Sequence, residues 1–376
     1  MLKLSNRSLL SLIGGCRLMQ RAASYSSSST YDPSTRIVRE PLYKQVGIIG
    51  FPTNLGQPNS GVQMGPRAIR RSGLFESIEA MGIELVDYGD MRVTEVFPDP
   101  PKFGLRHPRT HAENAMNISQ SLQVALNHQG KENILFCIGG DHSVSLGTVH
   151  GHAQVNKDMV LLWIDAHADC NTCLTSGSGN VHGMPLSFLI NELQEFVPRM
   201  EEFDELRPCI SFKDIAFIGL RDIDPGERYL LEKFGVTYYG MQEVDHLGIQ
   251  EVVRRSLQEV NPGFKRPIHL SFDIDSLDPG FAKCTGTPVP AGLTLREGLY
   301  IAEEVHRTGC LKVVDLVEVN PDLGDPAQSE VTVNAAKEVI RACFGWQRAG
   351  IVPSNYQIPM PADVNAESRV SLLREK

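Results

Sequence analysis

Short apolar runs rich in β-branched residues recur along the chain, and longer segments with helical spacing separate them. Eight runs predict strands, at residues 45–51, 83–88, 134–139, 159–164, 215–220, 236–239, 268–274 and 313–319. Helical patterns lie between them, for example at residues 66–81, 112–128, 247–260 and 295–309. This alternation predicts parallel strands joined by right-handed crossovers, and therefore an α/β fold.

Eight parallel strands can form an open sheet covered by helices or can close into a (β/α)₈ barrel. Periodicity alone does not separate these two architectures. No internal repeat or internal domain linker is visible, so a single domain is expected at residues 31–353. The segment after Pro353 contains proline and is irregular, which predicts a C-terminal tail at residues 354–376.

The predicted strand at residues 159–164 runs directly into Asp165, His167 and Asp169. Alternate residues of an extended chain point to the same side, so these three side chains could converge if the strand continues that far. Carboxylates and an imidazole together suit a divalent metal ion. Polar residues that merely cap a buried strand would give the same short pattern, so this motif alone leaves both interpretations open.

Two further predicted strands end in the same residue types. Residues 134–139 lead to Asp141 and His142, and residues 268–274 carry Asp273, followed by Asp275. Buried carboxylates without partners are costly, so packing alone would not place three such clusters at one sheet edge. Asp141 follows the glycine turn, and we expect it to hold that turn. The remaining two histidines and four aspartates are enough for two ions that share ligands. Oxygen and nitrogen ligands without a thiolate favour Mn²⁺ or Mg²⁺ over structural zinc.

Composition narrows the classes of partner. The chain has 376 residues, of which 41% are hydrophobic, and this is enough for one large α/β core. A net charge of −9 without a basic stripe argues against nucleic-acid binding. No apolar run approaches the roughly 18 residues of a membrane helix. We therefore expect neither a nucleic acid nor a membrane as partner, and the acidic balance is compatible with a cationic substrate.

The first thirty residues differ from the rest of the chain. They contain Lys3, Arg7, Arg17 and Arg21 and many serines, and the first acidic residue is Asp32. A basic, serine-rich segment without acidic residues is typical of a mitochondrial transit peptide. We expect residues 1–30 to direct the chain to mitochondria. Secretion and a disordered tail on a cytoplasmic protein are the alternatives.

Eight cysteines are scattered through the sequence, which is typical of free thiols in a reducing compartment. The only CxxC motif is formed by Cys170 and Cys173. A single CxxC is a weak indication of a redox or zinc site. Its position beside the Asp/His cluster favours a role in packing or at the rim of the site.

Six motifs occur in order, and together they resemble one family. They are GGDHS at 139–143, DAHADCNT at 165–172, SGNVHG at 178–183, SFDIDSLDP at 271–279, TGTPVPAGLTLREG at 285–298 and EVNP at 318–321. From about residue 46 to residue 348 the chain resembles the ureohydrolases, and among them the arginases. The resemblance implies an open eight-stranded parallel sheet with helices on both faces. It also implies a manganese-dependent hydrolase of linear amidines, which converts L-arginine to L-ornithine and urea.

The resemblance further implies two manganese ions per chain. The first would be held by His142, Asp165, Asp169 and Asp273. The second would be held by His167, Asp165, Asp273 and Asp275, so that Asp165 and Asp273 bridge the ions. Two ions about 3.5–4 Å apart can share a water and make it a hydroxide near neutral pH. That hydroxide would attack the guanidinium carbon, with Asp169 accepting its remaining hydrogen bond.

Residues that handle the substrate are also implied. His182 would move protons near the leaving amine, and Glu318 would accept two hydrogen bonds from the guanidinium. Thr287 lies in the TGTP motif and is expected near the opening of the same site. The α-carboxylate would meet Asn171 and Ser178, and the α-amine would lie near Asp224 and Glu227. The loop departs from the common arginase pattern at Cys173 and at Ser176-Gly177, and we expect this to affect the KM more than the type of reaction.

Alternatives remain at this point. A related enzyme of the family could act on another guanidino compound such as agmatine, which has no carboxylate to meet Asn171. A non-catalytic binding protein on the same fold would be expected to lack ligands, and none is missing. His150, His152 and His306 stand outside the motifs and are expected to be structural. The resemblance also implies a homotrimer, with Glu297 and Arg348 at the subunit contact.

Overall fold

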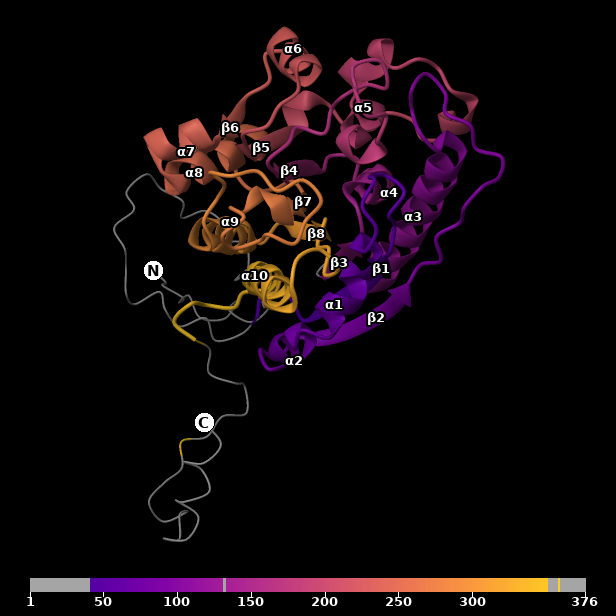
Figure 1. The fold of residues 1–376 in the computed structure, drawn as a ribbon. Helices are drawn as coiled ribbons and strands as arrows, with labels where there is room; N and C mark the ends of the chain where they lie inside the picture. Colours follow the sequence, from indigo (N-terminus) through magenta and orange to yellow (C-terminus); the bar gives the residue numbers. More distant parts are fainter. Residues whose placement is uncertain (1–40, 131–132, 351–357, 359–376) are drawn as a thin grey trace, which may run out of the picture.

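A computed structural model describes residues 41–130, 133–350 and 358 of the chain. Its strands are β1 (Gln45–Phe51), β2 (Glu84–Asp90), β3 (Ile134–Gly139), β4 (Val160–Ile164), β5 (Ile215–Leu220), β6 (Tyr238–Gly240), β7 (Ile268–Asp273) and β8 (Leu311–Val317). They form one parallel sheet in the order β2-β1-β3-β8-β7-β4-β5-β6 (Figure 1). Because β2 and β6 lie at opposite ends of this order, the sheet is open. The predicted open sheet is confirmed, and the barrel is excluded.

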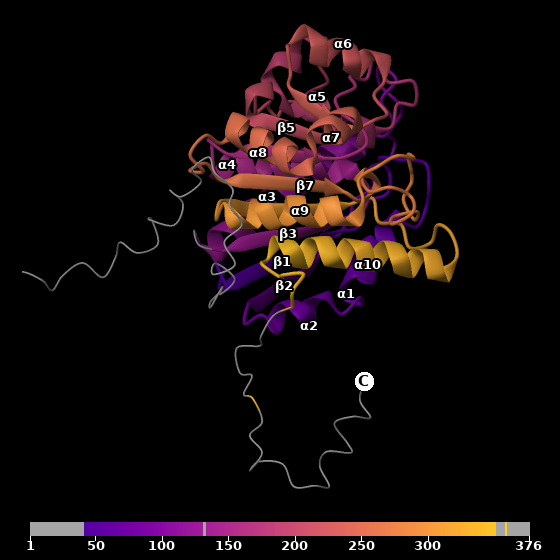
Figure 2. The same ribbon diagram turned by 90° about the vertical axis from the view of Figure 1, so that its left-hand side faces the viewer.

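Helices cover both faces of the sheet and complete three layers (Figures 1 and 2). One face packs against α3 (Pro108–Gln129), α4 (Ser145–Val155), α5 (Pro185–Leu189) and α6 (Pro225–Lys233). The other face packs against α1 (Gly65–Arg70), α2 (Leu74–Glu79), α7 (Met241–Leu247), α8 (Ile249–Val260), α9 (Leu295–Arg307) and α10 (Pro326–Cys343). No helix in the described part of the chain is both long and apolar enough to span a membrane.

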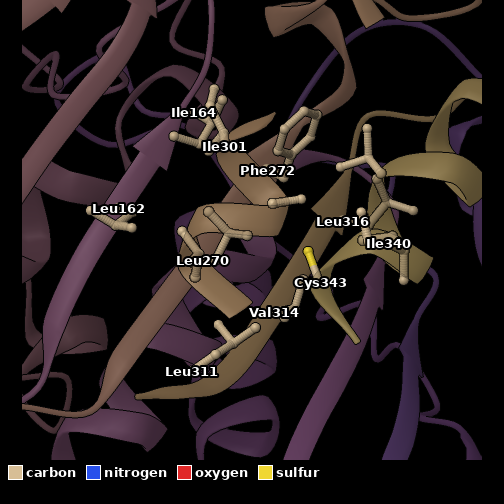
Figure 3. Close-up of a cluster of buried hydrophobic side chains, with 14 of the residues drawn as sticks. Leu162, Ile164, Leu270, Phe272, Ile301, Leu311, Val314, Leu316, Ile340 and Cys343 are labelled. Carbon is tan, nitrogen blue, oxygen red and sulfur yellow. The ribbon is translucent and has the colours of Figure 1, made fainter. Parts of the chain in front are cut away.

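The strand interiors are apolar on both faces because both faces are covered. In β4, Leu162 and Ile164 point toward α9 and α10, whereas Leu161 and Trp163 point toward α4 and α5. Figure 3 shows side chains of β4, β7 and β8, among them Leu162, Leu270 and Val314, in one apolar layer with residues of α9 and α10. Each such buried side chain contributes roughly 1.5–3 kcal/mol. This alternation fixes which side of each strand faces which helix layer.

Two helix predictions need correction. The predicted helix at 66–81 is two helices, α1 and α2, separated at Gly73, whose φ of 77° no helical residue adopts. The predicted helix at 247–260 likewise begins only at Ile249, after Gly248 with φ 76°. The predicted transit peptide lies outside the described residues. So does the predicted tail apart from Ile358, and both stay predictions.

Candidate active site and metal centre

The candidate site lies where neighbouring strands of the sheet end. His142 follows β3, Asp165 follows β4, Asp273 ends β7, and Glu318 follows β8. The strands β3, β8, β7 and β4 are consecutive in the sheet, so their carboxyl ends meet at one edge. Register supports this, because Ile164 of β4 pairs with Phe272 of β7 and the next residues are Asp165 and Asp273. Open α/β sheets place their sites at this edge.

His142 faces three carboxylates at once. Its Nδ1 lies 3.1 Å from an oxygen of each of the acidic residues Asp165, Asp169 and Asp273. Its Nε2 is 2.8 Å from the Ser271 hydroxyl, and its ring stacks on Trp163 with centroids 4.1 Å apart. These two contacts fix the ring, so that Nδ1 is presented to the carboxylates.

His167 forms the second half of the cluster. Its Nδ1 lies 3.3 Å from Asp165 Oδ1 and 3.2 Å from Asp275 Oδ2. Asp165 therefore turns Oδ2 toward His142 and Oδ1 toward His167. The six predicted ligands are brought together as two linked groups that share Asp165.

The way the DxHxD residues converge differs from the prediction. Strand β4 ends at Ile164, and Asp169 has a left-handed backbone with φ 49°. Simple alternation along an extended strand is therefore wrong. Asp169 turns back to His142, whereas His167 turns to Asp275, so the loop distributes the motif over both halves of the cluster.

Electrostatics indicate that this cluster fits divalent cations. All four aspartates are at most 6% exposed. Burial, reinforced by Asp165, raises the pKa of Asp169 to about 6, and burial with Asp275 raises the pKa of Asp273 well above its ordinary value. His142 Nδ1 and Asp165 Oδ2 lie 3.1 Å apart, but none of their contacts within the described residues has hydrogen-bond geometry. Cations bound among these atoms would offset the repulsion between the carboxylates and use ligand atoms that make no hydrogen bond.

Glu318 connects this cluster to His182. Its Oε1 accepts from the His142 backbone N–H at 2.9 Å and lies 3.1 Å from His182 Nδ1. Its Oε2 is buried and has no hydrogen-bond partner within the described residues. Burial lowers the pKa of His182, but the hydrogen bond and charge of Glu318 outweigh it and raise that pKa to about 9. Glu318 also has φ 61°, a strained conformation that functional sites often contain.

The residues predicted for the α-carbon end lie around the start of α6. Asn171 donates from Nδ2 to Asp224 Oδ2 at 2.8 Å, and its Oδ1 accepts from Thr175 at 2.8 Å. Glu227 accepts from the backbone N–H groups of Cys170 and Asp224 at 3.1 and 2.9 Å. Burial, followed by the charge of Asp169, raises the pKa of Glu227 to about 8. The structure therefore brings Asn171, Asp224 and Glu227 into one network.

Ser178 and Thr287 are placed apart from that network. Ser178 is exposed, and its hydroxyl accepts from the Asn180 backbone N–H at 3.2 Å. Thr287 donates to Asp275 Oδ2 at 3.0 Å, which places it beside the Asp/His cluster. Cys170 and Cys173 lie in the loop that carries Asn171 and Ser178. Both are buried free thiols, as expected for a packing role.

Sequence reasoning missed several residues that shape the site. Trp163 and Ser271 orient His142, and both occupy strand positions two residues before a predicted ligand. Residues two positions apart on a strand face the same side, so this spacing could have identified Trp163 and Ser271 from the sequence. Asp222 was also missed, and its Oδ2 lies 3.8 Å from His167 Nε2. Asp141 accepts from the backbone N–H groups of Gly56 and Ser143, which is the turn-holding role predicted for it.

Comparisons with known proteins agree with this geometry. Residues 44–345 match the model of the arginase family. The chain is 45% identical to a protein named "Arginase, hepatic" from Aquarana catesbeiana, over 85% of this chain and 98% of that protein. It is also 45% identical to Arginase-1 of Homo sapiens, over 82% and 95% of the two chains.

A solved structure supports the same assignment. The Entamoeba histolytica arginase, solved in complex with L-ornithine, matches with a TM-score of 0.71 and 30% identity, over 81% of this chain and 98% of that one. The fold of this chain therefore has a counterpart in a solved structure that is named as an arginase. On the family model, the sequence identity and the shared fold, the chain belongs to the arginase family.

Proposed function

We propose that this chain is a hydrolase that converts L-arginine to L-ornithine and urea. The observation that carries the proposal is its 45% identity, over more than four-fifths of its length, to proteins named as arginases. The strand-end cluster supplies the chemistry that such a reaction needs. Its buried carboxylates and imidazoles suit hard cations, and a buried acceptor lies beside them on Glu318.

We infer that the cluster holds two manganese ions. The first would be bound by His142, Asp165, Asp169 and Asp273, and the second by His167, Asp165, Asp273 and Asp275. The position of Asp165 between the two imidazoles supports a bridging role. When bound, such a pair of ions lowers the pKa of a shared water so that it is an effective nucleophile near neutral pH.

Glu318 is proposed to hold the guanidinium group. Its buried Oε2 is free to accept, and a carboxylate so deeply buried gains most from a cationic donor. Because Oε1 is held by the His142 backbone N–H, the orientation of Glu318 is fixed relative to the cluster. This arrangement would place the guanidinium carbon beside the attacking water.

Asp169 and His182 are proposed to manage protons. Asp169 would accept the hydrogen bond of the attacking water. His182, with its pKa raised to about 9, carries a proton at neutral pH and can give it to the leaving amine. Its hydrogen bond to Glu318 Oε1 keeps this imidazole beside the proposed guanidinium site.

The α-carbon end of the substrate is proposed to meet the loop before α5 and the start of α6. Asn171 and Ser178 would donate to the α-carboxylate, Asp224 and Glu227 would lie near the α-amine, and Thr287 would stand near the mouth of the site. Asn171 has one amide N–H left after its bond to Asp224. The α-carboxylate of the substrate would therefore join the hydrogen-bond network that Asn171 already forms with Asp224.

Urea release and metal content test the proposal together. Full-length protein stripped with a chelator and reloaded with Mn²⁺ should bind about two ions per chain and release urea from L-arginine. The stripped protein should be nearly inactive until Mn²⁺ is returned. Undiminished urea release from metal-free protein would contradict the two-ion mechanism, and no urea from the reloaded protein would contradict the assigned reaction.

A further inference from the structure

Arg221, the first residue after β5, binds backbone carbonyls around the site. Its Nη2 donates to Asp275 O and Val289 O at 2.7 Å each and to Leu277 O at 3.4 Å. Its Nη1 donates to Ser276 O at 3.1 Å and Gly219 O at 3.3 Å, and Nε adds a 3.2 Å bond to Val289 O. One guanidinium therefore joins the end of β5, the loop that carries Asp275, and the turn at Val289.

The fit around this guanidinium is close. A Cβ at Gly292 would lie 2.6 Å from Arg221 Nη2, so the turn after Val289 approaches the guanidinium with no room for a side chain. Each hydrogen bond that the guanidinium makes in the described structure ends on a carbonyl oxygen. A planar fork with five donors suits this arrangement, and a lysine ammonium cannot reproduce it.

The backbone of the same residue reaches the other ligand loop. The N–H groups of Arg221 and Asp222 donate to Ala166 O, at 2.9 and 3.0 Å. Ala166 lies between the predicted ligands Asp165 and His167. The chain then continues directly into Asp224 and Glu227, which hold Asn171 and the Cys170 N–H. Arg221 thus links both ligand loops to the segment proposed to read the α-carbon end.

We propose that Arg221 is a positioning residue that sets the distance between the metal centre and the α-carbon subsite, and so the length of substrate that is hydrolysed. This inference rests on the proposed function. If Arg221 is replaced by a side chain that is shorter or has no planar guanidinium group, the Asp275 loop and the segment at 222–227 are free to shift relative to each other. A displacement of about 1 Å at a reacting centre can reduce a rate about a hundredfold.

Substitution of Arg221 by lysine separates geometry from charge. Arg221→Lys keeps the positive charge beside the acidic cluster but can satisfy only part of the carbonyl set. Arg221→Met removes both the positive charge and the hydrogen bonds to the carbonyls, and it serves as a second variant. If charge alone matters, the lysine variant should behave like the native protein. If geometry matters, both variants should lose metal affinity and length discrimination.

Arg266 provides a matched control. Its guanidinium donates to the carbonyls of Asp158, Met159 and Val260 at 2.7, 3.1 and 3.0 Å. Asp158 and Met159 precede β4, and Val260 ends α8 before β7 begins, so these contacts lie at the opposite end of the strands from the site. Arg266→Lys therefore removes a similar set of backbone contacts without touching either ligand loop.

The experiment measures Mn²⁺ binding by calorimetry on the full chain, and kcat/KM for L-arginine and for L-homoarginine, which is one methylene longer. Arg221→Lys should weaken one of the two Mn²⁺ sites by about tenfold or more. It should also reduce the preference for L-arginine over L-homoarginine by about tenfold or more. Arg266→Lys should bind both ions as the native protein does and keep the native preference.

Three results would overturn the inference. The first is an Arg221→Lys protein with native Mn²⁺ affinity and native length preference. The second is the same losses in Arg266→Lys. The third is loss of the native far-ultraviolet spectrum in Arg221→Lys while Arg266→Lys folds, because the role would then concern the fold as a whole. A native protein that does not hydrolyse L-arginine would instead contradict the proposed function, and the Mn²⁺ titration would still decide the role of Arg221.

Discussion

Asp165 is the residue that both halves of the Asp/His cluster share, because its two oxygens face different imidazoles. Asp165→Asn should therefore weaken both ions and lower kcat/KM on the order of a hundredfold or more. His142→Asn should loosen mainly one ion, and excess Mn²⁺ should restore part of its activity. Elemental analysis of dialysed protein and urea assays at rising Mn²⁺ concentration measure both effects.

The two variants control for each other, since each removes one predicted ligand from the same buried cluster. Metal content near two in Asp165→Asn would exclude a bridging role for Asp165. Equal loss without any rescue in His142→Asn would show that the ions are not divided between the two histidines as proposed.

His306 allows a stability test away from the site. Its Nδ1 donates to the Cys343 carbonyl at 3.0 Å, and burial lowers its pKa from about 6.5 to about 4. The folded state thus holds His306 neutral while the unfolded chain takes up a proton below pH 6.5. Stability from this residue is complete above pH 6.5 and is lost as pH falls toward 4, by about 2 kcal/mol at pH 5.

The unfolding free energy, measured with urea at pH 7.5 and at pH 5, gives the contribution of His306 when the native protein is compared with His306→Gln. His306→Gln cannot take up the proton, so its loss of unfolding free energy between the two pH values should be about 2 kcal/mol smaller than that of the native protein. Equal losses in the native protein and in His306→Gln would show that His306 titrates alike in both states. Other buried histidines contribute equally to both proteins and cancel.

At the scale of residues, the sequence predicted which Asp and His side chains lie together at the strand ends, but it did not predict the residues that orient them. The six predicted ligands lie at or just after strand ends, and the carboxyl ends of parallel strands lie along one edge of the sheet whatever the strand order. Ser271, by contrast, reaches His142 only because β7 lies between β8 and β4. Arg221 reaches Val289 across 68 residues of sequence. Such partners depend on strand order, which local patterns do not contain.

At the scale of elements, the strand predictions succeeded because buried parallel strands are continuously apolar. Strands β1, β3 and β5 begin and end as predicted. The predicted bounds of the edge strands were less accurate, because β2 is half-exposed and β6 has only three residues. The helix at 66–81 failed at Gly73, because a single glycine inside a helical pattern does not reveal whether its φ is positive.

Gly140 supports an element-scale prediction. It ends the turn after β3, and a Cβ there would lie 1.8 Å from the Thr53 carbonyl oxygen. The Glu318 N–H also donates to the Gly140 carbonyl at 2.8 Å, so the turn cannot move without moving the site. Gly140→Ala should lower the unfolding free energy by about 3 kcal/mol or more. Thermal unfolding and urea release both report this loss.

Gly177→Ala is the control, because a Cβ there meets nothing within 4 Å and the backbone is not left-handed. It should change stability by less than about 0.5 kcal/mol. If Gly140→Ala unfolds at the native temperature with native activity, the close packing of the turn against Thr53 is not what holds His142 and Glu318 in register.

At the scale of the whole molecule, we expect a homotrimer. Within one chain, Arg348 forms a two-point ion pair with Glu303 at 2.9 and 2.8 Å, and Glu297 caps α9. The proposed contact between Glu297 and Arg348 of different chains would therefore compete with these bonds. Exposed pairs contribute little alone, so the trimer would depend on the rest of its interface. Sedimentation should give about three times the chain mass of 41.5 kDa. A species of single-chain mass at micromolar concentration would refute this.

The overall architecture was only partly contained in the sequence pattern. Alternating strands and helices predicted parallel pairing, yet open sheet and barrel have the same local pattern. The distinction depends on whether the first and last strands of the order pair, and β2 and β6 lie at opposite ends. Resemblance to a family decided between them, and the comparison with solved arginases agrees.

The ratio of kcat/KM for L-arginine to that for agmatine, measured with saturating Mn²⁺ on the full chain, tests the arginase assignment most directly. Agmatine lacks the carboxylate proposed to meet Asn171 and Ser178, and unpaired donors cost about 1–3 kcal/mol each. Misplacement of the reacting carbon adds to this loss, so arginine should be preferred about a hundredfold or more. Equal kcat/KM for the two compounds would contradict the arginase assignment.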